Sequence, residues 1–350
     1  MSKLSINLVT YNGSKYIPLL FESLKKQTHK EWELLILDNN SQDNTVELIK
    51  NELNNFSIQY QLQENKENIG FAGGHNKLYG LSKIDYFLIL NQDIFLEPDC
   101  LEKIVKFLDE NSETAAVAPR LMKWSIGLDG AKPNFTNIVD SLGLKVIRNR
   151  RVVDKYSQKR WEDIKGKLNL SYHTKNGAME VFGLSGALAI YRRDALRSVE
   201  LTTGKIFDED FVSYKEDVDL AYRLRIAGYS SCIILGAVAY HNRSAGIPEK
   251  LHDSVALVNK REQPLLVKYH SYKNHLATLY ANEYWQNFIL DFPWILWYEI
   301  KKFIYFLFFD RQVLKGVKEL WKNRACLKIK RRNNIKIRKI SSRQMRKWWN

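Results

Sequence analysis

Polar side chains stand at three places where an apolar run of the chain stops. The stretch YFLILNQD, residues 86–93, is apolar for five residues and then meets a lone carboxylate, Asp93. The three endings are Thr10-Tyr11-Asn12, Asp38-Asn39-Asn40 and Asn91-Gln92-Asp93. Oxygen ligands such as carboxylates suit Mg²⁺ and Mn²⁺, whereas Asn and Asp are also common turn residues. A metal site and a set of turns are therefore both open interpretations.

Two adjacent carboxylates, Glu216 and Asp217, begin a second segment that could do chemistry, YKEDVDLAYRLRIAGY. Apolar residues recur at helical spacing after them, which predicts an amphipathic helix that ends at Gly228. A carboxylate can act as a general base, but the helix dipole also favours acidic residues in a first turn whatever their task. Asp219 is expected to pair with Arg223 one turn later.

Over residues 4–110, the spacing of apolar residues alternates between the period of a β-strand and that of an α-helix, and these elements must position the polar groups. Strand patterns cover residues 4–12, 32–38, 57–62 and 85–91, and helical patterns cover 14–27, 44–53, 73–83 and 98–111. This order predicts a mostly parallel sheet covered by helices on both faces. Ligands of such sheets lie beyond the carboxyl ends of the strands, so the three polar endings should converge.

The second half of the sheet domain is less regular in sequence. Residues 120–180 are rich in Lys, Arg, Asn and Gly and are interpreted as loops or an insertion. A strand-like segment with a Ser-Gly break follows at 179–196, and SSCIILGAVAYH predicts a strand that ends at His241. We place the sheet domain at 1–245, with a boundary between its halves near residue 118, and a separate C-terminal region at 246–350.

Phosphate-binding loops of the common types are missing from the chain. It contains no GxxxxGK[ST] sequence, and only Gly13 follows the first predicted strand, where a dinucleotide fingerprint needs three glycines. Glycines cluster instead in ENIGFAGGHN, residues 67–76, before a predicted helix whose free N–H groups could face an anion. A tight loop is the alternative. His75 in this segment is expected at the surface.

Four segments, in this order and spacing, resemble family 2 glycosyltransferases of the GT-A fold, and among them bacterial rhamnosyltransferase-like members. They are the run from LVTYNGSKYI to NTVELI, then ENIGFAGGHN, LILNQD, and the run from FDEDFVSYKEDVDL to AVAYH. The resemblance covers residues 4–245. It implies a GT-A catalytic domain with a nucleotide-sugar-binding half, 1–118, and an acceptor half, 119–245.

The resemblance also implies which residues bind the donor. Base and ribose would lie against the first two strand ends, and the glycine segment would lie beside ribose and diphosphate. The implied nucleotide-sugar-binding residues are Thr10, Tyr11, Asn12, Asp38, Asn40, Asn68, Gly70, Asn76 and Asn91. For Asp38, capping the next helix or shaping its turn is the alternative.

The implied metal ligands are Asp93 and His241. Asp93 matches the last position of the family's DxD motif, and Asn91 replaces its first Asp, which leaves one charged ligand for a divalent cation, Mg²⁺ or Mn²⁺. Such cations often use one or two carboxylates together with substrate phosphates, so a single Asp can serve. His241 matches a position at which many GT-A enzymes place a further ligand, and a structural hydrogen bond is its alternative.

By the same match, Asp217 is the catalytic base and Glu216 its substitute. Inverting transfer needs a carboxylate to take the proton of the acceptor hydroxyl as its oxygen attacks the anomeric carbon. Ser185, Gly186 and Ala187 match a small-residue segment on the acceptor side. The basic residues of 145–151 could meet an acceptor phosphate or be solvated.

The net charge of +15 is concentrated at one end of the chain. Residues 310–350 hold 15 Lys and Arg against 2 acidic residues, whereas the rest is nearly neutral. Before them, residues 287–309 are rich in aromatics but carry charges in mid-run, which favours a helix lying in a membrane interface over a span. A helical pair packed on the sheet domain with a solvated tail is the alternative. The three cysteines form no CxxC pair, and no export signal is evident.

The sequence therefore predicts an inverting hexosyltransferase that moves rhamnose or another hexose from a dTDP- or UDP-sugar. Its acceptor would be a hydroxyl of a glycan or lipid-linked molecule in cell-surface polysaccharide synthesis. It would work in the cytoplasm, attached peripherally to the anionic inner face of the cell membrane. Two alternatives are a sugar-phosphate nucleotidyltransferase and a nucleic-acid-binding protein that uses its basic tail. The near-neutral body disfavours nucleic acid.

Overall fold

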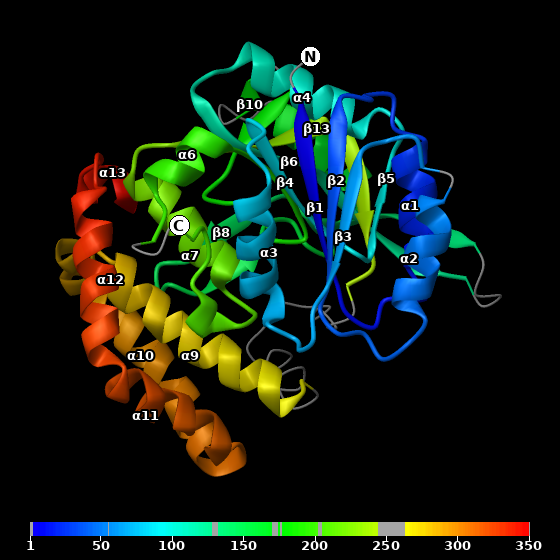
Figure 1. The fold of residues 1–350 in the computed structure, drawn as a ribbon. Helices are drawn as coiled ribbons and strands as arrows, with labels where there is room; N and C mark the ends of the chain where they lie inside the picture. Colours follow the sequence, from blue (N-terminus) through cyan, green and yellow to red (C-terminus); the bar gives the residue numbers. More distant parts are fainter. Residues whose placement is uncertain are drawn as a thin grey trace.

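A mixed β-sheet forms the centre of the molecule, and helices cover both of its faces (Figure 1). The computed structural model describes residues 3–54, 56–127, 132–169, 174–175, 177–201, 205–243 and 263–349. The sheet order is β10-β11-β13-β6-β12-β4-β1-β2-β3, with β5 paired to β13 and β7 paired to β6. The first four strands of the chain are parallel, and β12 joins them to the later strands by antiparallel pairing with β4.

The alternation expected for the first 110 residues is confirmed. The elements are β1 (Leu4–Thr10), α1 (Ile17–Lys25), β2 (Trp32–Asp38), α2 (Thr45–Leu53), β3 (Tyr60–Glu64), α3 (Gly70–Leu81), β4 (Tyr86–Asn91), β5 (Ile94–Leu96) and α4 (Cys100–Glu110). Strands β2 and β4 are largely apolar because both of their faces are buried, and β1 is buried on both faces although it contains Ser5 and Asn7. In α1, the residues at helical spacing, Ile17, Leu20 and Leu24, are fully buried.

The expectation of loops over residues 120–180 is wrong. The chain forms β6 (Thr114–Ile126), β7 (Pro133–Ser141), β8 (Leu144–Val146), β9 (Val152–Asp154), α5 (Trp161–Asn169), β10 (Thr174–Lys175) and β11 (Ala178–Glu180). Strand β6 lies between β12 and β13, in the interior of the sheet. Its pattern is hard to recognise because Pro119 interrupts it and its pairing shifts register against both β7 and β13.

The later elements complete the sheet and its cover. They are β12 (Leu188–Arg192), α6 (Arg193–Ser198), the 3₁₀ turn η1 (Glu209–Phe211), α7 (Glu216–Ile226) and β13 (Ser230–His241). Helix α7 ends before Gly228, whose φ is +88°, and β13 ends at His241, both as predicted. One apolar cluster packs α1, α2 and α4 against one face of the sheet, and a second packs α3, α6 and α7 against the other.

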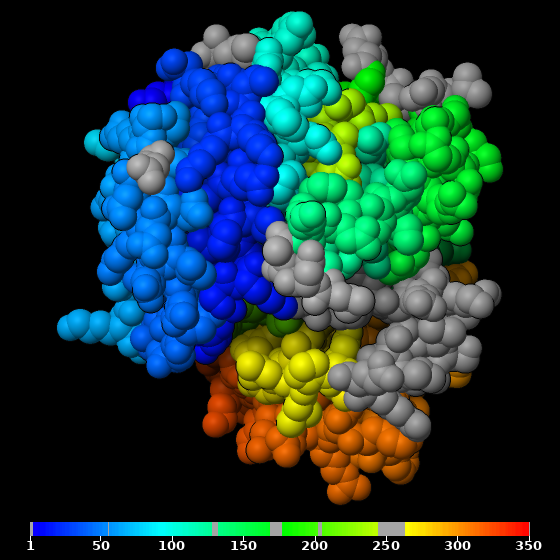
Figure 2. All heavy atoms as spheres, turned by 90° about the vertical axis from the view of Figure 1, so that its right-hand side faces the viewer, coloured from blue at the N-terminus to red at the C-terminus, as the bar shows by residue number. Residues whose placement is uncertain are grey.

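The C-terminal region is helical. It contains α9 (Leu265–Asn282), α10 (Trp285–Phe309), η2 (Arg311–Leu314), α11 (Lys315–Lys322), α12 (Arg324–Lys336) and α13 (Ser342–Arg346). Figure 1 shows these helices at the lower left of the molecule, on the side of α6 and α7, and Figure 2 shows α9 and α10 at its lower end. The expected domain boundary near residue 245 lies outside the described residues.

The last residues of the basic tail pack on the sheet domain. Met345 and Trp349 are buried in one cluster with Phe182 and Tyr222, and the Lys339 N–H donates to Ile226 O of α7 at 2.7 Å. From the sequence, residues 311–350 are interpreted as a polybasic segment because Lys and Arg dominate their composition. The few apolar residues that anchor the segment are spaced too widely to form a pattern.

Arg150, which was expected to be solvated or to meet an acceptor, is fully buried. Its guanidinium pairs with Glu283 at 2.6 Å and with Asp291 at 3.0 Å. Arg148 and Arg346 also pair with Asp291. Because a buried charge is stable only when paired, this cluster ties the loop before β9 to α10 and α13.

Helix α10 leaves one broad side uncovered, and that side is almost entirely apolar. Its exposed large apolar residues are Trp285, Phe288, Ile289, Leu290, Phe292, Trp294, Leu296, Trp297, Ile300, Phe303, Ile304, Leu307, Phe308 and Phe309. Asp291 and Glu299 lie on the covered side instead, where they form ion pairs. Of the helices in the described part of the chain, none has the length and apolar character needed to cross a membrane.

Candidate active site

The polar endings of β1, β2 and β4 converge as predicted. Thr10 lies opposite Asp38 in the register of β1 and β2, and Val9 lies opposite Asn91 in that of β1 and β4. The side chain of Gln92 joins the endings, because it accepts from the Tyr11 N–H at 3.0 Å and donates to the Tyr11 carbonyl at 3.1 Å.

Asp38 shapes the turn after β2. One of its oxygens accepts from Thr10 Oγ1 at 2.9 Å and from Ser41 Oγ at 2.6 Å, and the other accepts from the Ser41 N–H at 2.8 Å. The turn interpretation is therefore realised, and a contact of Asp38 with ribose or base stays a prediction. Tyr11 is nearly half exposed beside it and presents a flat ring.

Two asparagines at these endings adopt left-handed backbone conformations, Asn12 at φ +47° and Asn40 at φ +65°. Asparagine tolerates this region better than most residues because its side chain bonds locally. Asn12 Oδ1 accepts from the Gln42 N–H, and Asn40 Oδ1 accepts from Gln42 Nε2. These turns hold the backbone beyond β1 and β2 in a fixed shape.

The glycine segment brings α3 close to the acceptor half. Gly70 begins α3 at φ +75°, and a Cβ there would lie 2.5 Å from the carbonyl oxygen of Val212. Asn68 Oδ1 accepts from the Gly70 N–H at 2.8 Å. Asn76 uses both amide atoms on Phe207, at 2.9 Å each. The segment therefore joins the two halves of the sheet domain, and its contact with ribose or diphosphate stays a prediction.

His75 is fully buried, and the expectation that it lies at the surface is wrong. Its ring packs 4.4 Å from Phe71 and 6.3 Å from Phe207, measured between ring centroids. Burial lowers the pKa of His75 to about 3, so the ring is neutral. Because of its glycines, this segment has the composition of a loop. In the structure the segment forms the first turns of α3, which are buried.

Asp93 and His241 lie side by side at the ends of β4 and β13. His241 Nε2 is 3.4 Å from Asp93 Oδ2, and Nδ1 is 2.8 Å from Asp140 Oδ2. Burial alone would lower the pKa of His241, but Asp93 and Asp140 outweigh it and raise the pKa to about 9. Asp140 also pairs with Arg243 at 3.1 Å.

The chemistry of this pair fits a divalent cation that takes the place of the Nε2 proton, because a metal ion binds neutral imidazole. A histidine whose second nitrogen is held by a carboxylate is the usual arrangement for a metal-binding imidazole. Asp93 supplies an oxygen beside it, and Asn91 borders the same cavity. Among the described residues no group of three or more His, Cys, Asp or Glu could hold a metal, so substrate phosphates and water would have to complete the shell.

Asp217 faces the small-residue segment that the sequence singled out. One oxygen accepts from the Gly186 N–H at 3.1 Å, and the other accepts from the Val218 N–H at 2.8 Å. Burial raises the pKa of Asp217, whereas the nearby Lys215 lowers it. Glu216 has an oxygen without a partner among the described residues, and burial together with Asp217 raises its pKa to about 8. Burial thus raises the pKa of both carboxyls, and Asp217 differs in that each of its oxygens accepts a backbone N–H, which favours its charged form.

One cavity of about 410 Å³ joins these groups. Asn91, Asp93, His241, Ser185, Gly186, Ala187, Glu216 and Asp217 line it. Asp154, Tyr214, Lys215, Arg243 and Ser271 also line it and were missed by the sequence analysis. Lys215 adjoins the recognised carboxylates and could have been found from that position. Ser271 comes from α9, far along the chain, and no motif marks it.

Comparison with known proteins gives matches at the level of the family and of the fold. Residues 5–199 match the family model described as glycosyl transferase family 2. A chondroitin synthase of Pasteurella multocida (strain Pm70) is 24% identical over 318 residues, which cover 78% of this chain and 32% of that protein. A hyaluronan synthase of Pasteurella multocida is 24% identical over 317 residues, with the same two shares. The chain spans about a third of the length of these relatives.

Two solved structures resemble the fold. GalNAc-T7 with UDP, GalNAc and Mn²⁺ has a TM-score of 0.58 at 12% identity, over 80% of this chain and 48% of that one. The mannosyltransferase PcManGT of Pyrobaculum calidifontis, in complex with GDP-Man and Mn²⁺, has a TM-score of 0.51 at 16% identity, over 93% of this chain and 75% of that one. These likenesses show the GT-A fold. Since the family model covers more than half of the chain and the fold agrees with it, the protein belongs to glycosyl transferase family 2.

Proposed function

We propose that the protein is an inverting glycosyltransferase that moves a hexose from a UDP- or dTDP-sugar to a hydroxyl of a glycan or lipid-linked acceptor. One observation carries the proposal: the cavity that holds Asp217 also reaches Asp93 and His241. A base and a site for the leaving diphosphate are the two parts that such a transfer needs. Rhamnose is one candidate sugar, and the synthase relatives fit a role in cell-surface polysaccharide synthesis.

Asp217 is the proposed general base. The acceptor oxygen forms its bond to the anomeric carbon as the bond from that carbon to the diphosphate breaks, and Asp217 takes the acceptor proton. The Gly186 N–H fixes one carboxylate oxygen of Asp217, which orients the group toward the cavity.

Asp93 and His241 are the proposed ligands of a divalent cation, Mg²⁺ or Mn²⁺, with Asp140 holding the imidazole. When bound, the cation would supply positive charge to the leaving diphosphate. The donor itself is proposed to lie along Tyr11, Asp38 and the start of α3. A donor screen by calorimetry, with UDP-, dTDP- and GDP-sugars in the presence of Mg²⁺ or Mn²⁺, tests this assignment. If no nucleotide-sugar binds, the proposed function is wrong.

The pH dependence of transfer should report the charges around Asp217. Lys215 lowers the pKa of Asp217, so Lys215→Met should raise that pKa and move the acid limb of kcat to higher pH. Asp154 raises the pKa of Asp217, so Asp154→Asn should move the limb to lower pH. A pH–rate profile of both variants checks the opposite signs. Equal shifts in the same direction would show that Asp217 does not control the limb.

We also propose that the protein attaches to the inner face of the cell membrane through α10. The exposed side of this helix is apolar, and α11 and α12, which follow it, carry exposed Lys and Arg residues. Anionic lipid attracts such residues by about 1 kcal/mol each near the surface. An anionic bilayer therefore matches both the apolar side and its charged neighbours, and it suits a lipid-linked acceptor.

Binding to vesicles should depend on both features. The wild-type chain should sediment with vesicles of phosphatidylglycerol and phosphatidylcholine, and high salt should weaken this binding without abolishing it. Replacing Ile289, Trp297 and Phe308 by Ser should reduce binding at every salt concentration. Replacing Lys318, Lys322 and Lys328 by Gln should reduce it only at low salt. Tyr60→Ser, an exposed aromatic change far from α10 on β3, is the control. A wild-type chain that ignores anionic vesicles at low salt would refute the attachment.

A further inference from the structure

The turn that leads into α7 is held in an unfavourable backbone conformation. Val212 has φ +62° and ψ −64°, Tyr214 has φ +71°, and Lys215 has φ +75°. The Ser213 N–H donates to the Phe211 carbonyl at 2.6 Å, which makes residues 211–213 a γ-turn of the rarer form with positive φ. A β-branched residue in this conformation persists only where neighbouring groups hold it. Asp217 lies two residues after Lys215, the last of these residues with positive φ.

Asn274 of α9 is the group that holds the turn. It is fully buried, and its Nδ2 lies 2.9 Å from the Phe211 carbonyl, 3.0 Å from that of Ser213 and 2.7 Å from that of Tyr214. The two hydrogens of this amide are therefore shared among three backbone carbonyls, of which that of Phe211 also accepts from the Ser213 N–H. Removing the amide would take this donor from the Ser213 and Tyr214 carbonyls and loosen the turn.

The opposite side of the turn rests on the start of α3. The Val212 carbonyl accepts from the Ala72 N–H at 3.3 Å, and Gly70 has no Cβ to obstruct this approach. The turn therefore lies between the glycine segment of the donor half and α9 of the C-terminal region, and it contacts both. Helix α7 begins directly after the turn, and the Asp219 N–H donates to the Lys215 carbonyl at 2.9 Å.

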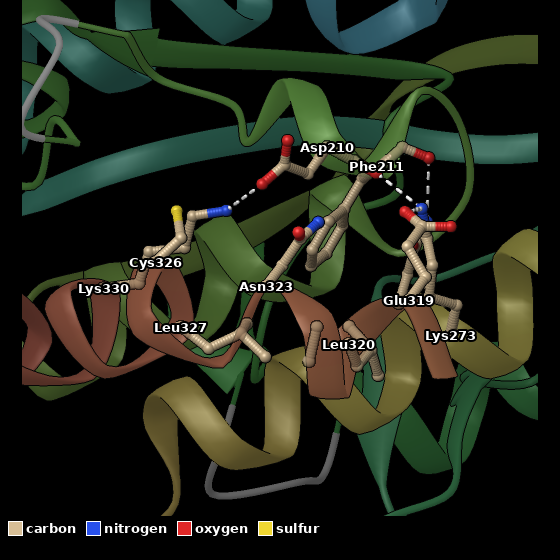
Figure 3. A pocket seen from close by; sticks show the side chains of 11 residues that line it. Asp210, Phe211, Lys273, Glu319, Leu320, Asn323, Cys326, Leu327 and Lys330 are labelled. Atoms are coloured by element: carbon tan, nitrogen blue, oxygen red, sulfur yellow. Dashed lines mark hydrogen bonds and ion pairs between the residues drawn. The ribbon is translucent and has the colours of Figure 1, made fainter. Parts of the chain in front are cut away.

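The residues before the turn are fixed by the same group of helices. Lys330 of α12 pairs with Asp210 at 2.6 Å and with Asp208 at 2.6 Å, and Lys273 Nζ donates to the Asp210 carbonyl at 2.9 Å. Figure 3 shows Lys330 directed at Asp210, and Lys273 beside Glu319 of α11. The C-terminal helices therefore contact Asp208 and Asp210 as well as the turn itself.

We propose that Asn274 is a positioning residue for the base: it keeps the 211–215 turn in the conformation that aims Asp217 at the acceptor. The inference rests on the proposed function, since it assigns a role to Asp217. Asn274 does not line the catalytic cavity and acts only through the turn. A shift of about 1 Å in a reacting group can lower a rate by roughly a hundredfold. A change in the conformation of the turn should therefore lower the rate of transfer.

The test compares two buried asparagines of the C-terminal helices. Asn274→Ala should lower kcat by roughly 10- to 100-fold and change the donor Kd much less, because the donor contacts proposed at Tyr11 and Asp38 lie on other elements than the turn, which touches the donor site at the start of α3. Hydrogen exchange of a peptide covering 209–218 should become faster. Asn334→Ala is the control, because Asn334 is also buried and, within the described part of the chain, its side-chain amide donates to Ala281 and Asn282 of α9 and not to the 211–215 turn. It should change neither kcat nor exchange at 209–218.

Each outcome decides the inference. A kcat within about threefold of wild type in Asn274→Ala, or unchanged exchange at 209–218, would overturn the positioning role. If Asn274→Ala does not fold, Asn274→Ser retains one donor and should show the same separation of kcat from Kd to a smaller extent. Absence of transfer by the wild-type chain would instead overturn the proposed function, and the exchange measurement, which needs no substrate, separates the two failures.

Discussion

Asp217→Asn should lower the rate of transfer by on the order of 10²- to 10⁴-fold and leave donor affinity within about twofold of wild type. The amide keeps the size of the carboxylate, so the cavity retains its shape. It cannot take the acceptor proton, however, and the loss appears only in the transition state. Initial rates with the best donor of the screen, together with calorimetric titration of that donor, measure the two quantities.

Asp219→Asn is the matched control for Asp217→Asn. Asp219 lies in the same turn of α7 but is buried against Arg223, with which it pairs at 2.8 Å, and against Asn282. Its replacement should lower the melting temperature while kcat stays close to wild type. Transfer that survives within tenfold in Asp217→Asn would exclude Asp217 as the base and direct attention to Glu216.

Asp93→Ala should weaken donor binding by about tenfold or more in the presence of Mg²⁺ or Mn²⁺, and it should remove any stimulation of binding by the cation. The carboxylate is the one negatively charged group that this chain offers to a cation at the NQD turn. The turn itself should persist, because the Asp93 carbonyl, which accepts from Trp124 Nε1 at 3.0 Å and from the Asn242 N–H at 3.0 Å, is retained.

Calorimetry of the donor with and without the cation separates loss of the metal from loss of the fold. Asp194→Ala, the same substitution at an exposed carboxylate on α6, should behave as wild type in both titrations. Donor affinity that stays unchanged in Asp93→Ala with the cation present would refute the assignment of Asp93 as a ligand.

The first half of the fold could be predicted because its signals are local. Strands β2 and β4, buried on both faces, are largely apolar, and helices with an apolar stripe follow the strands, so the alternation of β1 to β4 with helices is predicted without tertiary information. The short strand β5 was not predicted, because it pairs with β13, far along the chain. The convergence of Thr10, Asp38 and Asn91 follows from parallel strand order alone. Helix α7 was legible for the same reason, through Val218, Ala221 and Leu224.

The unpredicted parts depend on contacts that are distant in sequence. Strand β6 owes its place to pairing with β12 and β13, and its bulges and Pro119 break the local alternation. Asn274 is an ordinary polar residue of a helix until the fold places three carbonyls around it. His75 was misjudged because a glycine-rich segment resembles a loop, whereas its burial comes from Phe207, more than a hundred residues further along the chain.

The cluster that joins Met345 and Trp349 to Tyr222 has a consequence for the order of folding. Helix α7 carries the proposed base, yet the groups that cover its outer side are made after every other element described here. Domains generally fold as units, so this side of α7 stays uncovered until residues 345–349 have been synthesised. The helix of the proposed base therefore reaches its final packing only when the last described helix has joined the sheet domain.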